Sequence, residues 1–335
     1  MSGCRIGVNL FSSEKKAEKF RLGLDSCDML TMYMGQVCPV CIVSIFDGGN
    51  QIMIRIISDS TCDLSEELLK QYDIDIIPLQ ILLGDQNYED GCGITPDEIY
   101  RWSDENKSSP KTAACTQTRC EDIFMRHIDC GDEVICFSIS ESMSCTAGIM
   151  RMAAEAIGAA DRVSVVNSQN LSTGVGLLVL AAADMARSGM DRAAIEAEIE
   201  QLIPRVRASF VVDTLTYLHR GGRCSGVAAL FGSTLRMHPL ISVTGGKMEP
   251  GKKYRGRMNR VIDAYVEDLL PAIRNADSKR VFITHSGCDE AVIAAVYDKV
   301  KALGKFQEIH VTRAGGVISS HCGPGTLGVL FIGQK

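Results

Sequence analysis

From Met53 onwards, the sequence alternates between short apolar runs typical of buried strands and longer segments with the apolar spacing of helices. The stretch MIRIISDSTCDLSEELLKQY predicts a strand at residues 54–57, a polar turn, and a helix that Asp63 or Ser65 can cap. Further strand-like runs, each followed by a helix-like segment, occupy residues 74–84, 132–140 and 162–168. Such alternation implies a parallel sheet with helices on both of its faces.

The pattern changes after residue 209. Strands are expected within residues 209–215, 238–255 and 279–287, the second of them a hairpin that turns at Gly245–Gly246. Helices are expected at residues 259–275 and 289–304, and two last strands within residues 306–333. We therefore predict an α/β chain of two domains, a parallel-sheet domain at residues 53–209 and a mixed α/β domain at residues 210–335. Residues 1–52 lack this pattern and are interpreted as an N-terminal extension.

Charge and composition exclude several classes of protein. The formal net charge of −6 argues against nucleic acid as a partner. Residues 205–260 nevertheless hold eleven Lys/Arg and two Asp/Glu, which indicates either an anionic ligand or partner at that face, or scattered solvated charge. No apolar run approaches the ~18 residues of a membrane span, so stable membrane insertion is not expected. The fourteen cysteines lie scattered, often inside apolar runs, as is typical of reduced thiols in a cytoplasmic protein.

Polar loops follow several predicted strands, at the strand ends where open α/β sheets bind their ligands. They are residues 58–61, the loop around Thr112, residues 138–148 and residues 219–226. The stretch Ser144-Cys145-Thr146 precedes a helix, whose N-terminus favours an anion, although a simple helix cap would look the same. Arg220 and Arg223 flank two glycines and could contact a phosphate or carboxylate, or could surround a helix C-cap.

Motifs for self-contained chemistry are absent from the sequence. It contains no G-x-x-x-x-G-K-[ST] phosphate loop, no G-x-G-x-x-G after a strand, no G-x-S-x-G elbow and no H-E-x-x-H helix. Its six histidines do not have the spacing of metal ligands. We therefore expect a chain that holds an anion without a metal or a cofactor of its own.

Eight strings in order carry a resemblance to a known family. They are IISDSTCDLSEEL, PLQILLGDQNYEDG, PKTAACTQT, SISESMSCTAG, VVNSQNLSTGVGLLVL, FVVDTLTYLHRGGRCS, RGR and SSHCGPGTLGV. From Met53 to Gly333 the chain resembles the DegV family, the fatty-acid-binding B subunits of bacterial fatty acid kinase. The resemblance implies two α/β domains that enclose one long-chain fatty acid between them. It also implies a kinase partner, similar to dihydroxyacetone kinases, that uses ATP to convert the presented carboxylate to an acyl phosphate.

The resemblance assigns roles to particular residues. It implies that Thr112 and Ser144 bind the carboxylate, and we include Thr146 of the same loop. It implies that a second set contacts the headgroup, the phosphate or the kinase, and this set comprises Arg220, Arg223, Arg257 and His321. The chain would then be a non-catalytic substrate-binding subunit. Two departures flank the carboxylate site, because Cys145 stands where the family usually has glycine and Ala113-Ala114-Cys115 stand where it usually has Ser-Gln-Pro.

Two other functions stay open at this point. A stand-alone serine hydrolase or acyl-transfer enzyme could use Ser144 with His321. Ser320 is less suited to pair with His321, because we expect both in a strand, where neighbouring side chains point to opposite faces. A regulatory protein that senses lipid without passing it to a kinase would need the same binding residues. The Gly323-Pro324-Gly325 turn is expected to bring His321 to the carboxylate site, or to serve only as a structural turn.

Overall fold

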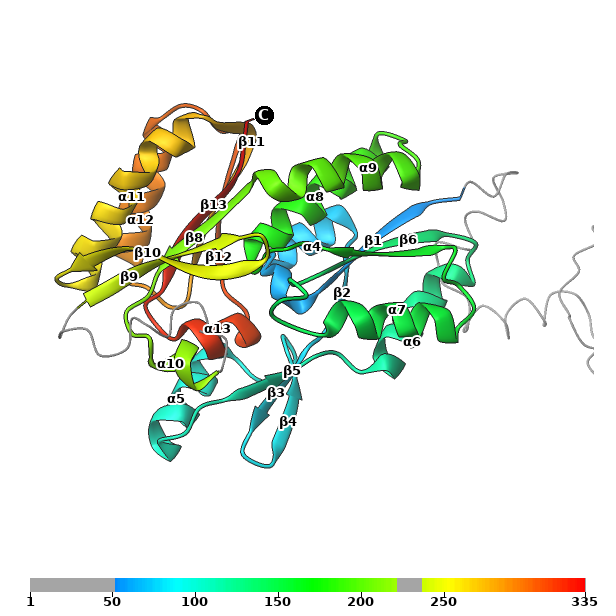
Figure 1. The fold of residues 1–335 in the computed structure, drawn as a ribbon, viewed down its shortest axis with the longest axis horizontal. Coiled ribbons are helices and arrows are strands. Elements are labelled where there is room, and N and C mark those ends of the chain that lie inside the picture. Colours follow the sequence, from blue (N-terminus) through cyan, green and yellow to red (C-terminus); the bar gives the residue numbers. More distant parts are fainter. Residues whose placement is uncertain (1–51, 222–236, 335) are drawn as a thin grey trace, which may run out of the picture. The chain divides into compact units, whose positions relative to one another are not determined.

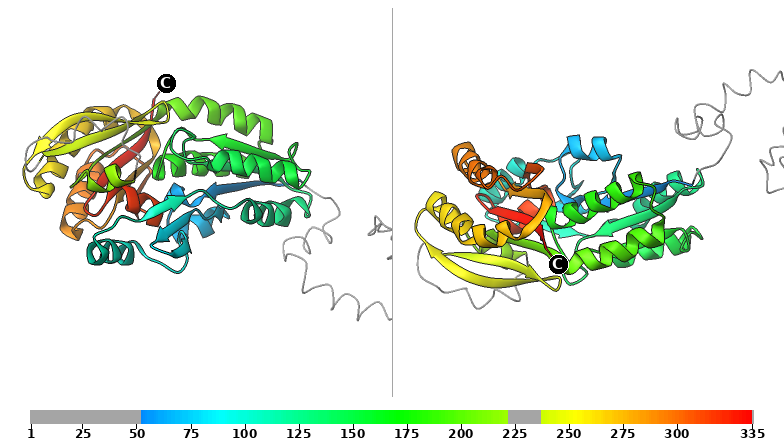
Figure 2. Two further views of the ribbon diagram at one scale, coloured as in Figure 1. Left: turned by 60° about the horizontal axis from the view of Figure 1, so that its bottom comes forward. Right: turned by 90° about the horizontal axis from the view of Figure 1, so that it is seen from above.

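The computed structural model describes residues 52–221 and 237–334. The predicted N-terminal extension lies outside this description, apart from residue 52. The described residues form three sheets with helices packed against them (Figure 1), and two further views show the same arrangement (Figure 2).

The first sheet has four parallel strands in the order β2-β1-β6-β7. Its strands are β1 (Ile54–Asp59), β2 (Asp75–Ile77), β6 (Glu133–Ser138) and β7 (Val163–Asn167). The helical segments between and after them are η2 (Ser60–Cys62), α4 (Glu66–Tyr72), α6 (Gln117–Ile128), α7 (Thr146–Ala156), α8 (Thr173–Arg187), α9 (Arg192–Leu202) and η3 (Ile203–Arg205). One face packs on α6 and α7 and the other on α4, α8 and α9, as predicted for a parallel sheet.

A small antiparallel sheet, ordered β4-β3-β5, follows the first strands. It consists of β3 (Gln80–Leu83), β4 (Gln86–Glu89) and β5 (Lys111–Ala113), with α5 (Pro96–Asn106) between the last two. Helix α5 begins at the N-cap Thr95, which forms a reciprocal capping box with Glu98. We had expected one continuous strand at residues 74–84; Pro78 interrupts that run, and its two halves join different sheets.

The third sheet has six strands in the order β10-β9-β8-β13-β11-β12. Its strands are β8 (Val206–Val211), β9 (Met237–Thr244), β10 (Lys247–Arg255), β11 (Ala276–His285), β12 (Glu308–Arg313) and β13 (Leu327–Gly333). Its helices are α10 (Thr216–Arg220), α11 (Met258–Arg274), α12 (Glu290–Ala302) and α13 (Gly316–Cys322). Only β11 and β12 pair in parallel, so this second α/β region is mixed, as predicted. The hairpin β9–β10 turns at Gly245 and Gly246, both of which have positive φ.

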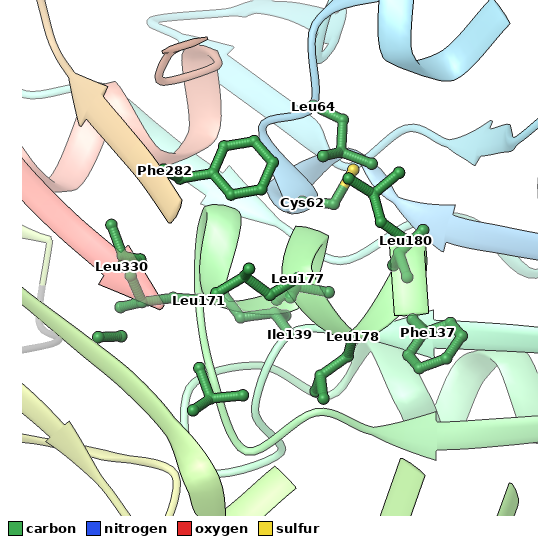
Figure 3. Close-up of a cluster of buried hydrophobic side chains, with 14 of the residues drawn as sticks. Cys62, Leu64, Phe137, Ile139, Leu171, Leu177, Leu178, Leu180, Phe282 and Leu330 are labelled. Atoms are coloured by element: carbon green, nitrogen blue, oxygen red, sulfur yellow. The ribbon is translucent and has the colours of Figure 1, made fainter. Parts of the chain in front are cut away.

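The first and third sheets pack on one shared hydrophobic core around α8. Ten of the fifteen residues of α8 are buried, which fits a helix that is apolar on all sides. Figure 3 shows its leucines Leu177 and Leu178 between Phe137 of β6 and Phe282 of β11. A core that joins both sheets fixes the loops that lie between them.

Helix α9 ends at Leu202, because Pro204 fits only the first turn of the short η3 that follows. One further sequence-based expectation was wrong: the segment with Ser320 and His321, expected as a strand, forms helix α13 between β12 and β13. The division of the chain between residues 209 and 210 stays a prediction; β8, which pairs in the third sheet, begins at Val206.

Candidate functional site

A cavity of about 490 Å³ lies where the loops of the first sheet meet the small sheet, α13 and the third sheet. Its volume falls within the range of ~300–1,000 Å³ typical of ligand pockets. Most of its lining is apolar, and the larger apolar side chains are Leu79, Ile139, Met143, Leu171, Phe210, Leu218, Met248, Val317, Ile318 and Leu330. Such a lining suits an extended hydrocarbon chain.

Polar side chains also line this cavity, and three of them are predicted site residues from separate elements. Thr112 comes from β5, Ser144 from the turn before α7, and His321 from the last turn of α13. The Oγ1 atom of Thr112 lies 2.7 Å from Nε2 of His321, although 209 residues separate them in sequence. The structure thus joins the predicted carboxylate-binding threonine to the predicted headgroup histidine.

Ser144 and Thr146 have different positions. The Oγ atom of Ser144 lies 2.8 Å from Oγ1 of Thr146 and also accepts a 3.3 Å hydrogen bond from the backbone N–H of Thr146. Ser144 is half-buried and faces the cavity, whereas Thr146 is fully buried and does not line it. Thr146 is therefore placed to orient Ser144, and direct contact of Thr146 with a ligand stays a prediction.

Cys145 lies at the cavity between these two residues and is exposed to solvent. Its backbone angles, φ −84° and ψ 8°, are open to any L-residue. The departure from glycine therefore needs no unusual backbone at this position, and its consequence is a thiol on the cavity surface. Ala113 and Ala114, at the other departure from the family pattern, also line the cavity.

Of the three predicted arginines, the structure places only the side chain of Arg257 relative to the cavity. Arg257 is exposed at the N-cap of α11 and does not line the cavity. Arg220 is the last residue of α10, and Arg223 lies outside the described residues. Gly221, which follows Arg220, packs directly against the ring of His321; a Cβ atom there would lie 2.8 Å from Cε1. The arginine stretch therefore begins beside the histidine, and the role of its side chains stays a prediction.

The serines beside His321 serve the helix itself. Ser320 Oγ donates a 2.7 Å hydrogen bond to the carbonyl of Gly316, and Ser319 Oγ donates a 3.1 Å bond to the carbonyl of Ala314. Both side chains are buried and lie outside the cavity lining. The argument against Ser320 as a nucleophile assumed a strand, and that assumption was wrong, because Ser320 and His321 lie on α13.

Three buried carboxyl groups near the site were missed as a group by the sequence analysis. They are Asp59, Asp63 and Asp90. Burial raises the pKa of Asp59 to about 6 and that of Asp63 to about 8, and it raises the pKa of Asp90 as well. Asp59 lies in the first predicted polar loop, yet it does not line the cavity; it accepts hydrogen bonds from Thr61 and from the backbone N–H of Ile139. The sequence signal was an acidic residue at the end of a strand, which does not distinguish a ligand contact from a structural one.

The fold and this cavity agree with the sequence comparison. A family model described as "Uncharacterised protein, DegV family" matches residues 53–334. The chain therefore belongs to the DegV family.

Individual relatives cover the same part of the chain. A DegV domain-containing protein of Deinococcus radiodurans is 31% identical over 276 residues, which are 82% of this chain and 97% of the relative. A solved structure of a fatty-acid-binding DegV family protein from Thermus thermophilus is 30% identical, covers 84% of this chain and all of its own, and has a TM-score of 0.78. The B3 protein of Streptococcus pneumoniae fatty acid kinase, solved with linoleic acid, is 17% identical with a TM-score of 0.72, over 84% of this chain and all of its own, and so shows a shared fold.

Two further features are the hydropathy of the helices and the state of the cysteines. None of the helices within residues 52–221 and 237–334 combines the length and the hydropathy that crossing a membrane requires. Eight cysteines in these ranges have free thiols.

Proposed function

We propose that the protein binds one long-chain fatty acid in this cavity, with the acyl chain against the apolar lining and the carboxylate at the polar side chains. The observation that carries the proposal is the contact between Thr112 and His321 at the surface of a largely apolar cavity. Family membership and the likeness to the Thermus thermophilus fatty-acid-binding protein support it. Each buried CH₂ contributes ~0.8 kcal/mol, so the chain supplies most of the affinity and the polar contacts set the orientation.

Each polar side chain has a specific part in this proposal. Thr112 and Ser144 donate hydroxyl hydrogen bonds to the carboxylate, and Thr146 orients Ser144 through the 2.8 Å contact between their oxygens. Ser144 lies just before the eleven-residue helix α7, whose N-terminus favours a negative charge. His321 contacts the carboxylate and, when protonated, offsets its charge.

We further propose that the chain presents this carboxylate to an ATP-dependent kinase partner similar to dihydroxyacetone kinases. The sequence has no phosphate-binding loop of its own, so the partner would bring ATP. The fold shared with the fatty acid kinase B3 protein supports the pairing. Exposed Arg257, together with Arg220 and Arg223, would then contact the partner or the more anionic acyl phosphate. The chain would act in the cytoplasm as a non-catalytic subunit, with the fatty acid as its ligand and no cofactor.

Reconstitution tests both parts of the proposal. The protein, stripped of lipid, is mixed with palmitic acid, ATP and a dihydroxyacetone-kinase-like subunit, and acyl phosphate is trapped with hydroxylamine. We expect acyl hydroxamate only when all components are present, and native mass spectrometry to show one fatty acid per chain. A chain that takes up no fatty acid overturns the whole proposal, whereas uptake without acyl phosphate overturns only the kinase pairing.

A further inference from the structure

Helix α13 forms part of the cavity surface and carries the headgroup histidine. Val317, Ile318, His321 and Cys322 all line the cavity from this one seven-residue helix. Its sequence, GVISSHC, contains glycine, β-branched residues and serines, which are weak helix formers. The helix therefore depends on contacts from outside its own sequence.

Two buried carboxyl groups supply those contacts at the first turn of α13. Oδ1 of Asp63 accepts a 2.8 Å hydrogen bond from the backbone N–H of Gly315. Oδ1 of Asp90 accepts bonds of 2.8 Å from Gly316 and 3.3 Å from Val317. These N–H groups have no partner within a helix, so the carboxyl oxygens satisfy donors that would otherwise be buried and unpaired.

The two carboxyl groups come from distant parts of the chain. Asp63 follows β1 and η2, Asp90 follows β4, and both are only 5% exposed. Each lies more than 220 residues before its partner in α13. The close approach requires glycine in the helix, because a Cβ atom on Gly316 would lie 2.9 Å from Asp90 Oδ1.

Asp63 also contacts a second part of the cavity surface. The hydroxyl of Ser172 donates a hydrogen bond to Oδ2 of Asp63, and Ser172 lines the cavity at the start of α8. One carboxyl group thus joins α13 to α8. A displaced α13 would disturb both elements.

We propose that Asp63 and Asp90 are positioning residues that hold His321 against Thr112 through α13, so that they set the recognition of the headgroup without touching it. This inference rests on the proposed binding of a fatty acid. In a helix of seven residues, a shift of the first turn is transmitted to the last turn, where His321 Nε2 lies 2.7 Å from Thr112. Asp63 and Asp90 do not line the cavity, so their effect on a ligand must pass through other residues.

The test compares two ligands that share a chain and differ in headgroup, palmitic acid and 1-hexadecanol. A role in headgroup recognition changes the ratio of the two dissociation constants, whereas a merely structural role weakens both ligands alike. The variants are Asp63→Ala, Asp90→Ala and Asp90→Asn, with His321→Ala as reference. Asp132→Ala is the matched control: Asp132 is also 5% exposed, but it accepts from Arg55 and Met53, before the start of β6, and does not line the cavity.

We expect Asp63→Ala and Asp90→Ala to reduce the preference for the acid about tenfold, as His321→Ala does, because a charge-assisted contact is lost. Asp90→Asn keeps an acceptor oxygen for Gly316 and should retain most of the preference, and Asp132→Ala should retain all of it. Asp90→Ala combined with His321→Ala should lose no more than His321→Ala alone. An unchanged ratio in both alanine variants, or an equal loss of acid and alcohol binding, overturns the inference.

A second measurement needs no ligand. The NMR signals of the His321 ring should move in Asp90→Ala and in Asp63→Ala, and should stay in place in Asp132→Ala. Unmoved signals in the first two variants overturn the positioning role even if the protein binds fatty acid. A wild-type protein that shows no preference for palmitic acid, with ring signals that do move, instead contradicts the proposed function and leaves the positioning by Asp63 and Asp90 supported.

Discussion

At the scale of single residues, Thr112 is placed to contact both His321 and a bound ligand. Its hydroxyl lies 2.7 Å from the imidazole of His321 and also lies on the cavity surface. A hydroxyl both donates and accepts, so Thr112 can accept from His321 while it donates to a ligand carboxylate. The site therefore requires the hydroxyl group of Thr112 more than it requires a side chain of that size.

Replacement of Thr112 tests that requirement. Thr112→Val keeps the shape of the side chain and removes the hydroxyl, so we expect palmitic acid to bind about tenfold more weakly, a loss of about 1–2 kcal/mol. Thr112→Ser keeps the hydroxyl and serves as the matched control. Isothermal titration calorimetry on lipid-free protein measures both constants. If the valine variant and the wild type bind palmitic acid with equal affinity, the carboxylate does not contact Thr112.

Cys145 offers a probe of where the ligand lies. Cys145 and Cys92 are both exposed free thiols, but only Cys145 lines the cavity. We expect bound palmitic acid to slow the alkylation of Cys145 by N-ethylmaleimide, because the ligand covers this side of the cavity. Alkylation of Cys92 should be unchanged. Peptide mass spectrometry of the two sites, with and without ligand, measures the rates; equal protection at both sites, or at neither, would contradict this placement.

At the scale of elements, local signals predicted some structures and missed others. The start of α4 at Ser65 and the hairpin turn at Gly245–Gly246 follow from residues within a few positions of one another, and both are confirmed. Helix α13 was missed because its first turn is completed by carboxyl groups from the other half of the chain. The helix propensity of residues 316–322 is weak, and it does not indicate that distant residues complete the helix.

The buried carboxyl groups also predict how stability depends on pH. The pKa values of Asp59 and Asp63 are raised by burial to about 6 and about 8, so between about pH 4 and pH 8 the folded chain binds more protons than the unfolded chain. The free energy of unfolding contributed by these groups therefore falls as the pH rises through this window. Asp63→Asn removes one of these titrations and should make the decline shallower, most clearly above pH 6. Urea denaturation at several pH values measures the slopes, and parallel curves for both proteins would refute this account.

At the scale of the whole described fold, one buried cation joins elements of both large sheets. Arg280 of β11 is 4% exposed and contacts Asp184 of α8 at 2.5 Å and Glu308 of β12 at 2.6 Å. It also donates to the hydroxyl of Tyr72 on α4. These contacts tie the third sheet to two helices of the first.

We expect Arg280→Ala to lower the free energy of unfolding by about 3 kcal/mol, at the lower end of the range for a broken buried ion pair, because its two acidic partners are partly exposed. Lys299→Ala is the control: Lys299 pairs with Asp263 and Glu267 on the surface, and its loss should cost less than about 1 kcal/mol. Chemical denaturation measures both changes. Similar small losses in the two variants would show that Arg280 is not a structural link.

The sequence predicted the classes of the two larger sheets better than their topology. Alternation of strands and helices indicated a parallel sheet before residue 209 and a mixed one after it, and both are confirmed. The order β10-β9-β8-β13-β11-β12 puts the last strand, β13, in the middle of its sheet, which no local pattern reveals. The sequence led us to expect His321 near the carboxylate site, but only the fold shows that it touches Thr112.

In the proposed complex, a fatty acid lies in the cavity with its carboxylate at Thr112 and His321. NMR of palmitic acid labelled with ¹³C at the carboxyl carbon observes that group itself. We expect one bound carboxyl signal that shifts in Thr112→Val and again in His321→Ala. A bound signal that is the same in the wild type and in both variants would contradict it.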